Sequence, residues 1–141
     1  MKIRTLITVW IPRVWIPAVM LAATSYAHSP EENAGVTIEP VLATVLAETA
    51  DKHATVVRVV LEPGAVSAPH RHPGTVLVYV LQGEVVSALD DGEPQTFKAG
   101  EAWKEHPGAL HRVAKNTTHE VAKLLAVLVH DEGAELQTLA E

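Results

Sequence analysis

The sequence predicts an all-β domain built as a double-sheet jelly roll. Short runs rich in valine and other β-branched residues recur at a spacing of about eight to twelve residues, which is typical of β-sandwiches and barrels. Glycine and proline turns separate these runs, and a closed double sheet protects most of the strand edges. The chain has 141 residues, enough for one domain with one core, and its 48% apolar content favours a folded over a disordered chain.

The first 27 residues are expected to be an export signal and not part of the fold. They carry three positive charges and no acidic residue, followed by an apolar run over 14–23 and a small-x-small cleavage site, Ser25-Tyr26-Ala27. The apolar run is too short to span a membrane, so we expect no stable membrane insertion after cleavage and a periplasmic or secreted protein. An uncleaved membrane anchor is the alternative.

Residues 28–35 are polar and turn-rich and are expected to form a linker, which leaves 36–141 for the barrel. Within the barrel, β-branched content and Pro40 favour a strand over a helix at 36–49. The hydrophobic pattern of 121–130 fits the period of a helix as well as that of a strand. Its place after regular strand-turn-strand units favours a strand. The last residues form a polar tail or a short helix. The other expected strands are 54–61, 75–81, 85–89, 95–98, 102–105 and 110–114.

Charge and composition exclude several kinds of partner and chemistry. Removal of residues 1–27 takes the formal net charge from −6 to −9, and the remaining basic residues are scattered. A domain this acidic is a poor match for nucleic acid or for an anionic membrane, so we expect neither as a partner. The chain has no cysteine, which excludes thiolate nucleophiles and cysteine-ligated zinc.

Three histidines are the strongest chemical signal. His70 and His72 form an H-x-H pair, and side chains two apart on an extended strand point to one face. His111 opens a later strand after the Pro107-Gly108 turn, and in a barrel it can meet the pair. Three neutral imidazoles aimed at one point suit a divalent transition metal, Fe(II) or Zn first, with Mn, Ni and Cu as further options. The alternative is a set of packed or surface histidines.

Two motifs make the chain resemble the cupin superfamily over residues 55–129. In the first, Gly64 is followed by five residues, then by His70-x-His72, and Gly83 ends the segment. In the second, Gly100 is followed by five residues, His106-Pro107-Gly108, two residues and His111. The resemblance implies a double-stranded β-helix, the jelly-roll barrel of cupins, and says little about the reaction.

The chain departs from the cupin pattern in two places. The carboxylate of the first motif should fall at Val76 or Leu77, and both are apolar, so a site of three histidines and that glutamate is not expected. The motif's proline position holds His106, and Asn116 lies one residue beyond the motif's asparagine. What remains resembles the three-histidine sites of some cupin dioxygenases that act on thiols or diketones, and also cupins that only bind a ligand.

Two further residues are candidates for acid–base catalysis, His106 and Glu105, which adjoin the second motif. The simpler interpretation of His106 is a partly exposed turn residue. We therefore expect an exported metal-dependent cupin acting on a small molecule, an oxidoreductase, isomerase or lyase, with a non-catalytic ligand- or metal-binding module as the alternative. The resemblance also implies a homodimer, for which the valine-rich strand 54–61 is the expected exposed edge.

Overall fold

The computed structural model describes residues 33–47, 49 and 51–140, and over these residues the chain is all β. This confirms the predicted fold class. The strands are β1 (Val36–Val45), β2 (Lys52–Leu61), β3 (Val66–Ser67), β4 (His70–Arg71), β5 (Thr75–Gln82), β6 (Glu84–Leu89), β7 (Gln95–Lys98), β8 (Ala102–Glu105), β9 (Leu110–Lys115), β10 (Ala122–Asp131) and β11 (Thr138–Leu139).

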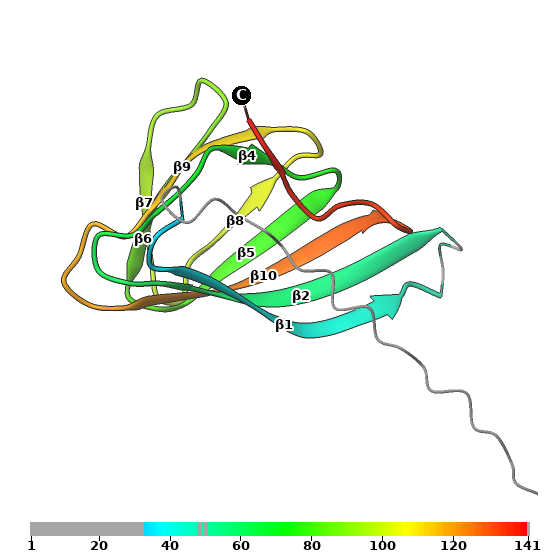
Figure 1. Ribbon diagram of the computed structural model, residues 1–141, viewed down its shortest axis with the longest axis horizontal. Helices are drawn as coiled ribbons and strands as arrows, with labels where there is room; N and C mark the ends of the chain where they lie inside the picture. Colours follow the sequence, from blue (N-terminus) through cyan, green and yellow to red (C-terminus); the bar gives the residue numbers. More distant parts are fainter. Residues whose placement is uncertain (1–32, 48, 50, 141) are drawn as a thin grey trace, which may run out of the picture.

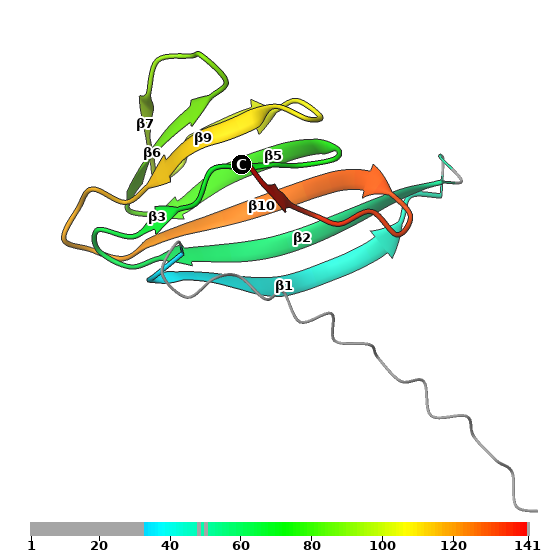
Figure 2. The ribbon, with the colours of Figure 1, turned by 45° about the horizontal axis from the view of Figure 1, so that its top comes forward.

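The strands form two antiparallel sheets that lie over one another (Figures 1 and 2). The first sheet, which we call sheet A, has the order β1-β2-β10-β5-β8. The second, sheet B, has the order β11-β4-β9-β6-β7, and β3 also pairs with β9. Strands far apart in sequence are therefore neighbours: β10 lies between β2 and β5, and β9 lies between β4 and β6. This crossing topology is that of a jelly roll.

Alternation along the strands explains how this sequence fills the space between the sheets. In β5, Val76, Val78 and Val80 are buried, while Leu77 and Tyr79 are exposed. β10 alternates in the same way, which confirms the strand predicted for the run that fitted either period. Side chains two apart on a strand share a face, so each sheet contributes one apolar face to a common core.

The edge of sheet A is β1 and not the strand predicted from the sequence. The valine-rich segment 54–61 lies in β2, which pairs with β1 on one side and β10 on the other. That expectation was wrong because a run of β-branched residues predicts a strand but does not predict which strands pair with it. β1 suits an edge because it contains Pro40, which cannot donate a ladder hydrogen bond, and its register shifts between Pro40 and Leu42.

The end of the chain is a strand and not the polar tail or short helix expected. β11 pairs with β4, with Leu139 opposite His70 and Thr138 opposite Arg71. Just before it, Leu136 packs against the apolar core. A two-residue strand carries no period, so its pairing depends on distant residues that local sequence does not reveal.

The predicted signal segment, 1–27, lies outside the described residues, as does most of the linker. Among the residues that the structure describes, no helix is long and apolar enough to cross a membrane.

Candidate metal centre

The three histidines predicted as metal ligands come together between the sheets. His70 in β4 pairs directly with His111 in β9, and His72 follows β4 at the start of the turn into β5. One nitrogen from each of the three lies within 4.8 Å of the other two. His70 and His111 are buried and His72 is half-buried. The two motif loops are also tied together, because Gly108 N donates to His72 O at 2.8 Å and the Arg71 guanidinium donates to Gly108 O at 2.6 Å.

Backbone carbonyls fix the orientation of the first two imidazoles. His70 Nδ1 lies 2.7 Å from Ala68 O, and His72 Nδ1 lies 2.6 Å from Leu136 O. A carbonyl oxygen can only accept a hydrogen bond, so each Nδ1 carries the proton and each Nε2 carries a lone pair. Metal-ligating histidines commonly donate their other ring N–H to a backbone carbonyl in this way, which sets their tautomer.

His111 is held by Ser87 in the neighbouring strand β6. Its Nε2 lies 2.9 Å from Ser87 Oγ, which leaves Nδ1 facing the interior of the site. Burial, followed by repulsion from His70 and His72, lowers the pKa of His111 to about 3. Burial also lowers the pKa of His72, although its bond to Leu136 O opposes the shift. These two imidazoles are therefore neutral at neutral pH, as metal ligands must be.

Glu105, one of the two predicted acid–base residues, lies in the same cluster. It is the last residue of β8 in sheet A, and only 2% of its surface is exposed. Its Oε1 lies 3.2 Å from His111 Nδ1 and its Oε2 lies 3.7 Å from His72 Nε2. The indole of Trp103 donates to Oε1 at 3.0 Å, whereas Oε2 has no hydrogen-bond partner. Burial raises the pKa of Glu105 to about 7, with the Trp103 bond opposing the shift.

His106, the other predicted acid–base residue, is exposed. It follows Glu105 directly, and Ala109 N donates to its carbonyl oxygen at 3.1 Å, as in a turn. Since Glu105 is buried among the histidines and His106 faces solvent, the structure favours the turn interpretation that the sequence offered for His106.

Three supporting residues of the site were not predicted from the sequence as its partners: Ser87, Leu136 and Trp103. Ser87 and Leu136 act through contacts with residues 24 and 64 positions away, which no local pattern reveals. Trp103 packs against Phe97 with ring centroids 4.7 Å apart. The sequence did contain one indication of the hydrogen bond between Trp103 and Glu105, because residues two apart on a strand share a face.

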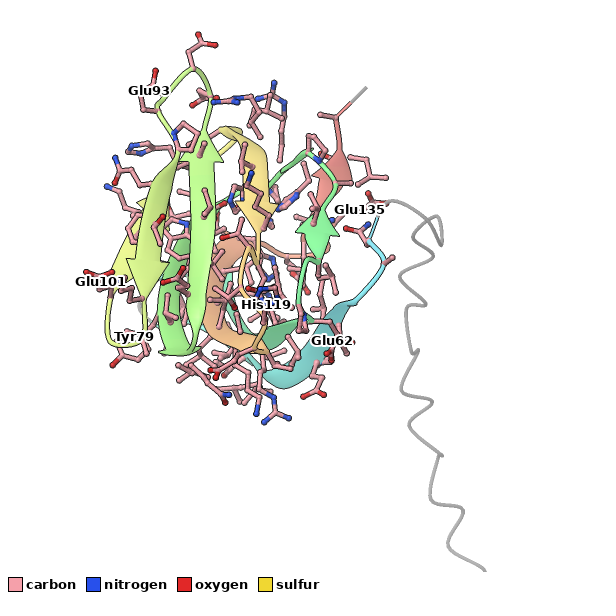
Figure 3. The ribbon with its side chains drawn as sticks, turned by 90° about the vertical axis from the view of Figure 1, so that its left-hand side faces the viewer. Glu62, Tyr79, Glu93, Glu101, His119 and Glu135 are labelled. Carbon is pink, nitrogen blue, oxygen red and sulfur yellow. The ribbon has the colours of Figure 1, made fainter. Side chains whose placement is uncertain are left out.

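A cavity of about 250 Å³ adjoins the cluster. Ser87, Phe97 and Trp103 are among its lining residues, together with polar groups of the β6–β7 hairpin and Lys104. Figure 3 shows Glu93, another lining residue, at the tip of that hairpin. Ser87 contacts His111 and Trp103 contacts Glu105, so two lining residues touch the cluster, although neither the histidines nor Glu105 line the cavity themselves.

The donor set fits a divalent transition metal. Three neutral imidazoles and an acidic oxygen provide the nitrogen and oxygen ligands that Zn and Fe(II) accept. The buried Oε2 of Glu105 supplies a direct sign, because a buried acidic oxygen with no donor is costly unless a cation compensates it.

Comparisons with known proteins place the chain in a family. Residues 57–128 match the family model described as the cupin domain. A conserved double-stranded β-helix protein of Klebsiella pneumoniae is 32% identical, with a TM-score of 0.55 over 73% of this chain and 85% of that one. No match was found among curated proteins.

More distant structures share the fold alone. They include an oxalate oxidase, 18% identical with a TM-score of 0.61 over 83% of this chain and 61% of that one. A polyketide cyclase, RemF of Streptomyces resistomycificus, is 20% identical with a TM-score of 0.56 over 74% of this chain and 75% of that one. The matched cupin model covers more than half of the chain and includes all three histidines, so this protein belongs to the cupin family.

Proposed function

We propose that this cupin is a metal-dependent enzyme acting on a small molecule, with dioxygenase-like chemistry. The observation that carries the proposal is the convergence of His70, His72 and His111 at one point beside a small cavity. Cupins of similar fold include an oxalate oxidase and a polyketide cyclase, both of which act on small molecules. Fe(II) suits the oxidative reaction, and Zn suits the isomerase or lyase alternative.

The roles of the residues follow from their positions. His70, His72 and His111 would hold the metal, which when bound supplies a Lewis acid and, for Fe(II), access to dioxygen. Phe97 and Trp103 give the cavity an aromatic wall that would position an organic substrate. Lys104 and Glu93, which also line the cavity, would orient the polar groups of the substrate. Glu105 is the carboxylate that lies among the histidines, and it replaces His106 as the predicted site residue that the geometry favours.

A non-catalytic binding module is the second candidate. The cavity, at about 250 Å³, is smaller than the roughly 300–1,000 Å³ of common ligand pockets. A cupin that binds a metal or a small ligand without turnover would need no larger space.

The test starts from metal content. We expect the purified full chain, loaded with Fe(II) or Zn and then dialysed, to retain metal, and His72→Ala to lose most of it. Glu132→Gln, which changes an exposed acidic side chain, is the matched control. If neither the wild type nor the variant retains metal, the proposal is refuted. With metal retained, oxygen uptake over a panel of thiols, diketones and phenols separates the oxygenase from the binding module.

We also propose that the protein is exported and that it forms a homodimer. Export rests on the N-terminal segment, and the check is fractionation of cells expressing the full chain: cytosolic retention of all the protein would contradict it. The dimer rests on the cupin resemblance and on the exposed apolar residues of sheet A, which include Leu77 and Tyr79.

A further inference from the structure

We infer that Glu105 is a fourth metal ligand, so that the carboxylate missing from the first cupin motif is supplied by the neighbouring strand. The inference rests on the proposed metal site and goes beyond it, because it changes the site from three neutral ligands to three neutral ligands and one anion. It also differs from the acid–base role expected from the sequence, since it places the carboxylate on the metal.

Strand pairing explains how the carboxylate arrives. Val76 of β5, a position where the motif's glutamate is expected, lies directly opposite Glu105 of β8. Residues directly opposite in an antiparallel pair have Cβ atoms about 4.5–5.5 Å apart and share a face of the sheet. Both side chains are buried, at 2% exposure each. A glutamate at 105 therefore reaches the same region between the sheets as one at 76.

One contact of Glu105 has the length found between ligands of one metal, and the other is slightly longer. Two ligand atoms that each lie about 2.1 Å from a metal are about 3.0 Å apart in an octahedron and about 3.4 Å apart in a tetrahedron. Glu105 Oε1 lies 3.2 Å from His111 Nδ1, within this range, and Glu105 Oε2 lies 3.7 Å from His72 Nε2, just above it. These contacts join Glu105 to ligands from both motifs, and they bring a group from sheet A against His111 of sheet B and His72 just after β4.

The hydrogen-bond pattern also calls for a cation at this point. His72 Nδ1 donates its proton to Leu136 O, so His72 presents a lone pair from Nε2 towards Glu105 Oε2. That oxygen is buried and has no donor. Two acceptors that face each other in a buried site need either a proton or a metal ion between them, and a divalent metal would bind both.

Trp103 positions the carboxylate for this role. Its indole, which can only donate, bonds Oε1 at 3.0 Å and leaves Oε2 to face His72. Metal-ligating carboxylates are commonly oriented by such a hydrogen bond from a neighbouring group. Trp103 also packs on Phe97, which fixes the plane of its ring.

The experiment compares the full-length wild type with Glu105→Gln, using Co(II) as a spectroscopic probe and Zn(II) in competition with a chelator. We expect Glu105→Gln to weaken Zn(II) binding at least 10-fold and to change the visible spectrum of bound Co(II), because one ligand atom is exchanged. Glu132→Gln should alter neither. A double variant, Val76→Glu with Glu105→Gln, should recover affinity if it folds, since it returns the carboxylate to the other strand.

The outcomes separate this inference from the proposed function. A wild type that binds no metal refutes the metal site itself. A wild type that binds metal, with the same Zn(II) affinity in Glu105→Gln, overturns the inference and leaves Glu105 as an acid–base group. Weaker binding with an unchanged Co(II) spectrum also overturns it, because a nearby charge then acts without coordination. If the double variant does not fold, the comparison of wild type with Glu105→Gln alone decides.

Discussion

At the scale of single residues, the site combines His70 with two imidazoles, of His72 and His111, whose pKa burial lowers, and with one buried carboxylate. The contacts of Glu105 with His72 and His111 are close enough for ion pairs, yet burial lowers the pKa of both histidines and raises that of Glu105. Without metal these contacts are therefore not ion pairs at neutral pH. A bound divalent cation would oppose the effect of burial on the pKa of Glu105 and favour the ionised carboxylate.

The first prediction concerns the stability of the metal-free protein. The pKa of Glu105 is raised from 4.5 to about 7, so the folded state holds its proton more tightly than the unfolded state. The resulting stability is fully present below pH 4.5 and is lost as the pH rises through 7. We expect Glu105→Gln, which stays neutral, to be more stable than wild type at pH 8 by about 1–3 kcal/mol, and similar to it at pH 4.5.

Denaturant unfolding at both pH values, with a chelator present, measures this difference. His111 titrates in both proteins, so its contribution largely cancels in the comparison. Glu132→Gln should show no pH-dependent difference from wild type. Equal stability of wild type and Glu105→Gln at pH 8 would mean that the buried carboxylate carries no penalty. With Zn(II) in excess the order should reverse, because the anionic ligand then stabilises the fold through the metal.

A second prediction concerns Asn116, which is 1% exposed. Its amide donates to the carbonyls of Leu61, Glu62 and Glu120 at 3.1, 3.2 and 2.7 Å. Asn116→Ala removes this donor and leaves buried acceptors unpaired, so we expect a loss of about 2–4 kcal/mol in the free energy of unfolding. Thr117→Ala, at the exposed neighbour, should cost less than about 0.5 kcal/mol. Thermal and denaturant unfolding of the two variants test this, and equal effects would contradict it.

At the scale of elements, the sequence predicted what local patterns encode. Runs of β-branched residues and the glycine and proline turns predicted the strands, position after regular strand-turn-strand units predicted β10, and the H-x-H spacing predicted two ligands. The sequence did not reveal relations between strands. Val76 indicated that the usual carboxylate was missing, but only the pairing of β5 with β8 shows that Glu105 lies opposite it. Asn116 is a second example. It lies one residue beyond the motif position, yet its side chain still closes the loop before β10.

The third prediction concerns the C-terminal segment. Leu136 O orients His72, and β11 pairs with β4, the strand that contains His70. A chain that ends at Glu135 loses both contacts, so we expect its Zn(II) affinity to fall about 10-fold, as when other hydrogen-bond partners of metal-ligating histidines are removed. A chain that ends at Ala140 keeps both and serves as the control.

Chelator competition on the two truncated chains measures the effect. Circular dichroism should confirm that both remain folded, although the shorter chain also loses the packing of Leu136 on the core. Equal affinities would show that the segment does not orient His72 for metal binding.

At the scale of the whole molecule, the metal centre lies where the two sheets meet. His70 and His111 come from sheet B, and Glu105 comes from sheet A. The apolar core fills the space between the sheets further along. The inner faces are thus occupied, and what remains open for a partner is the outer surface.

The outer face of sheet A carries an apolar row that crosses four strands. Leu77 in β5 lies opposite Val127 in β10, Val127 opposite Val56 in β2, and Val56 opposite Leu42 in β1. Leu77 is 48% exposed, and Tyr79 beside it points away from the sheets in Figure 3. Contiguous exposed apolar surface of this kind is typical of protein interfaces.

The proposed homodimer would use this face. The row ends at Lys104, opposite Leu77, on the β8 side, and near its other end Glu39 of β1 forms an ion pair with Arg58 of β2. A two-fold axis through the middle of the row would reverse the partner, so that each Lys104 would approach the partner's Glu39–Arg58 pair. Such an arrangement is isologous and closes as a dimer.

The last prediction follows from this arrangement. We expect the wild type to sediment as a dimer and Leu77→Lys to sediment as a monomer, because each two-fold contact would bury two unpaired charges in apolar surface. Leu139→Lys is the matched control: Leu139 is also exposed, at 43%, but lies in β11 of sheet B, so this variant should remain a dimer. Analytical ultracentrifugation over a range of concentrations measures the mass. A monomeric wild type, or a dimer that survives Leu77→Lys, would contradict pairing through this face, and Zn(II) binding retained by Leu77→Lys would show that the metal centre forms within one chain.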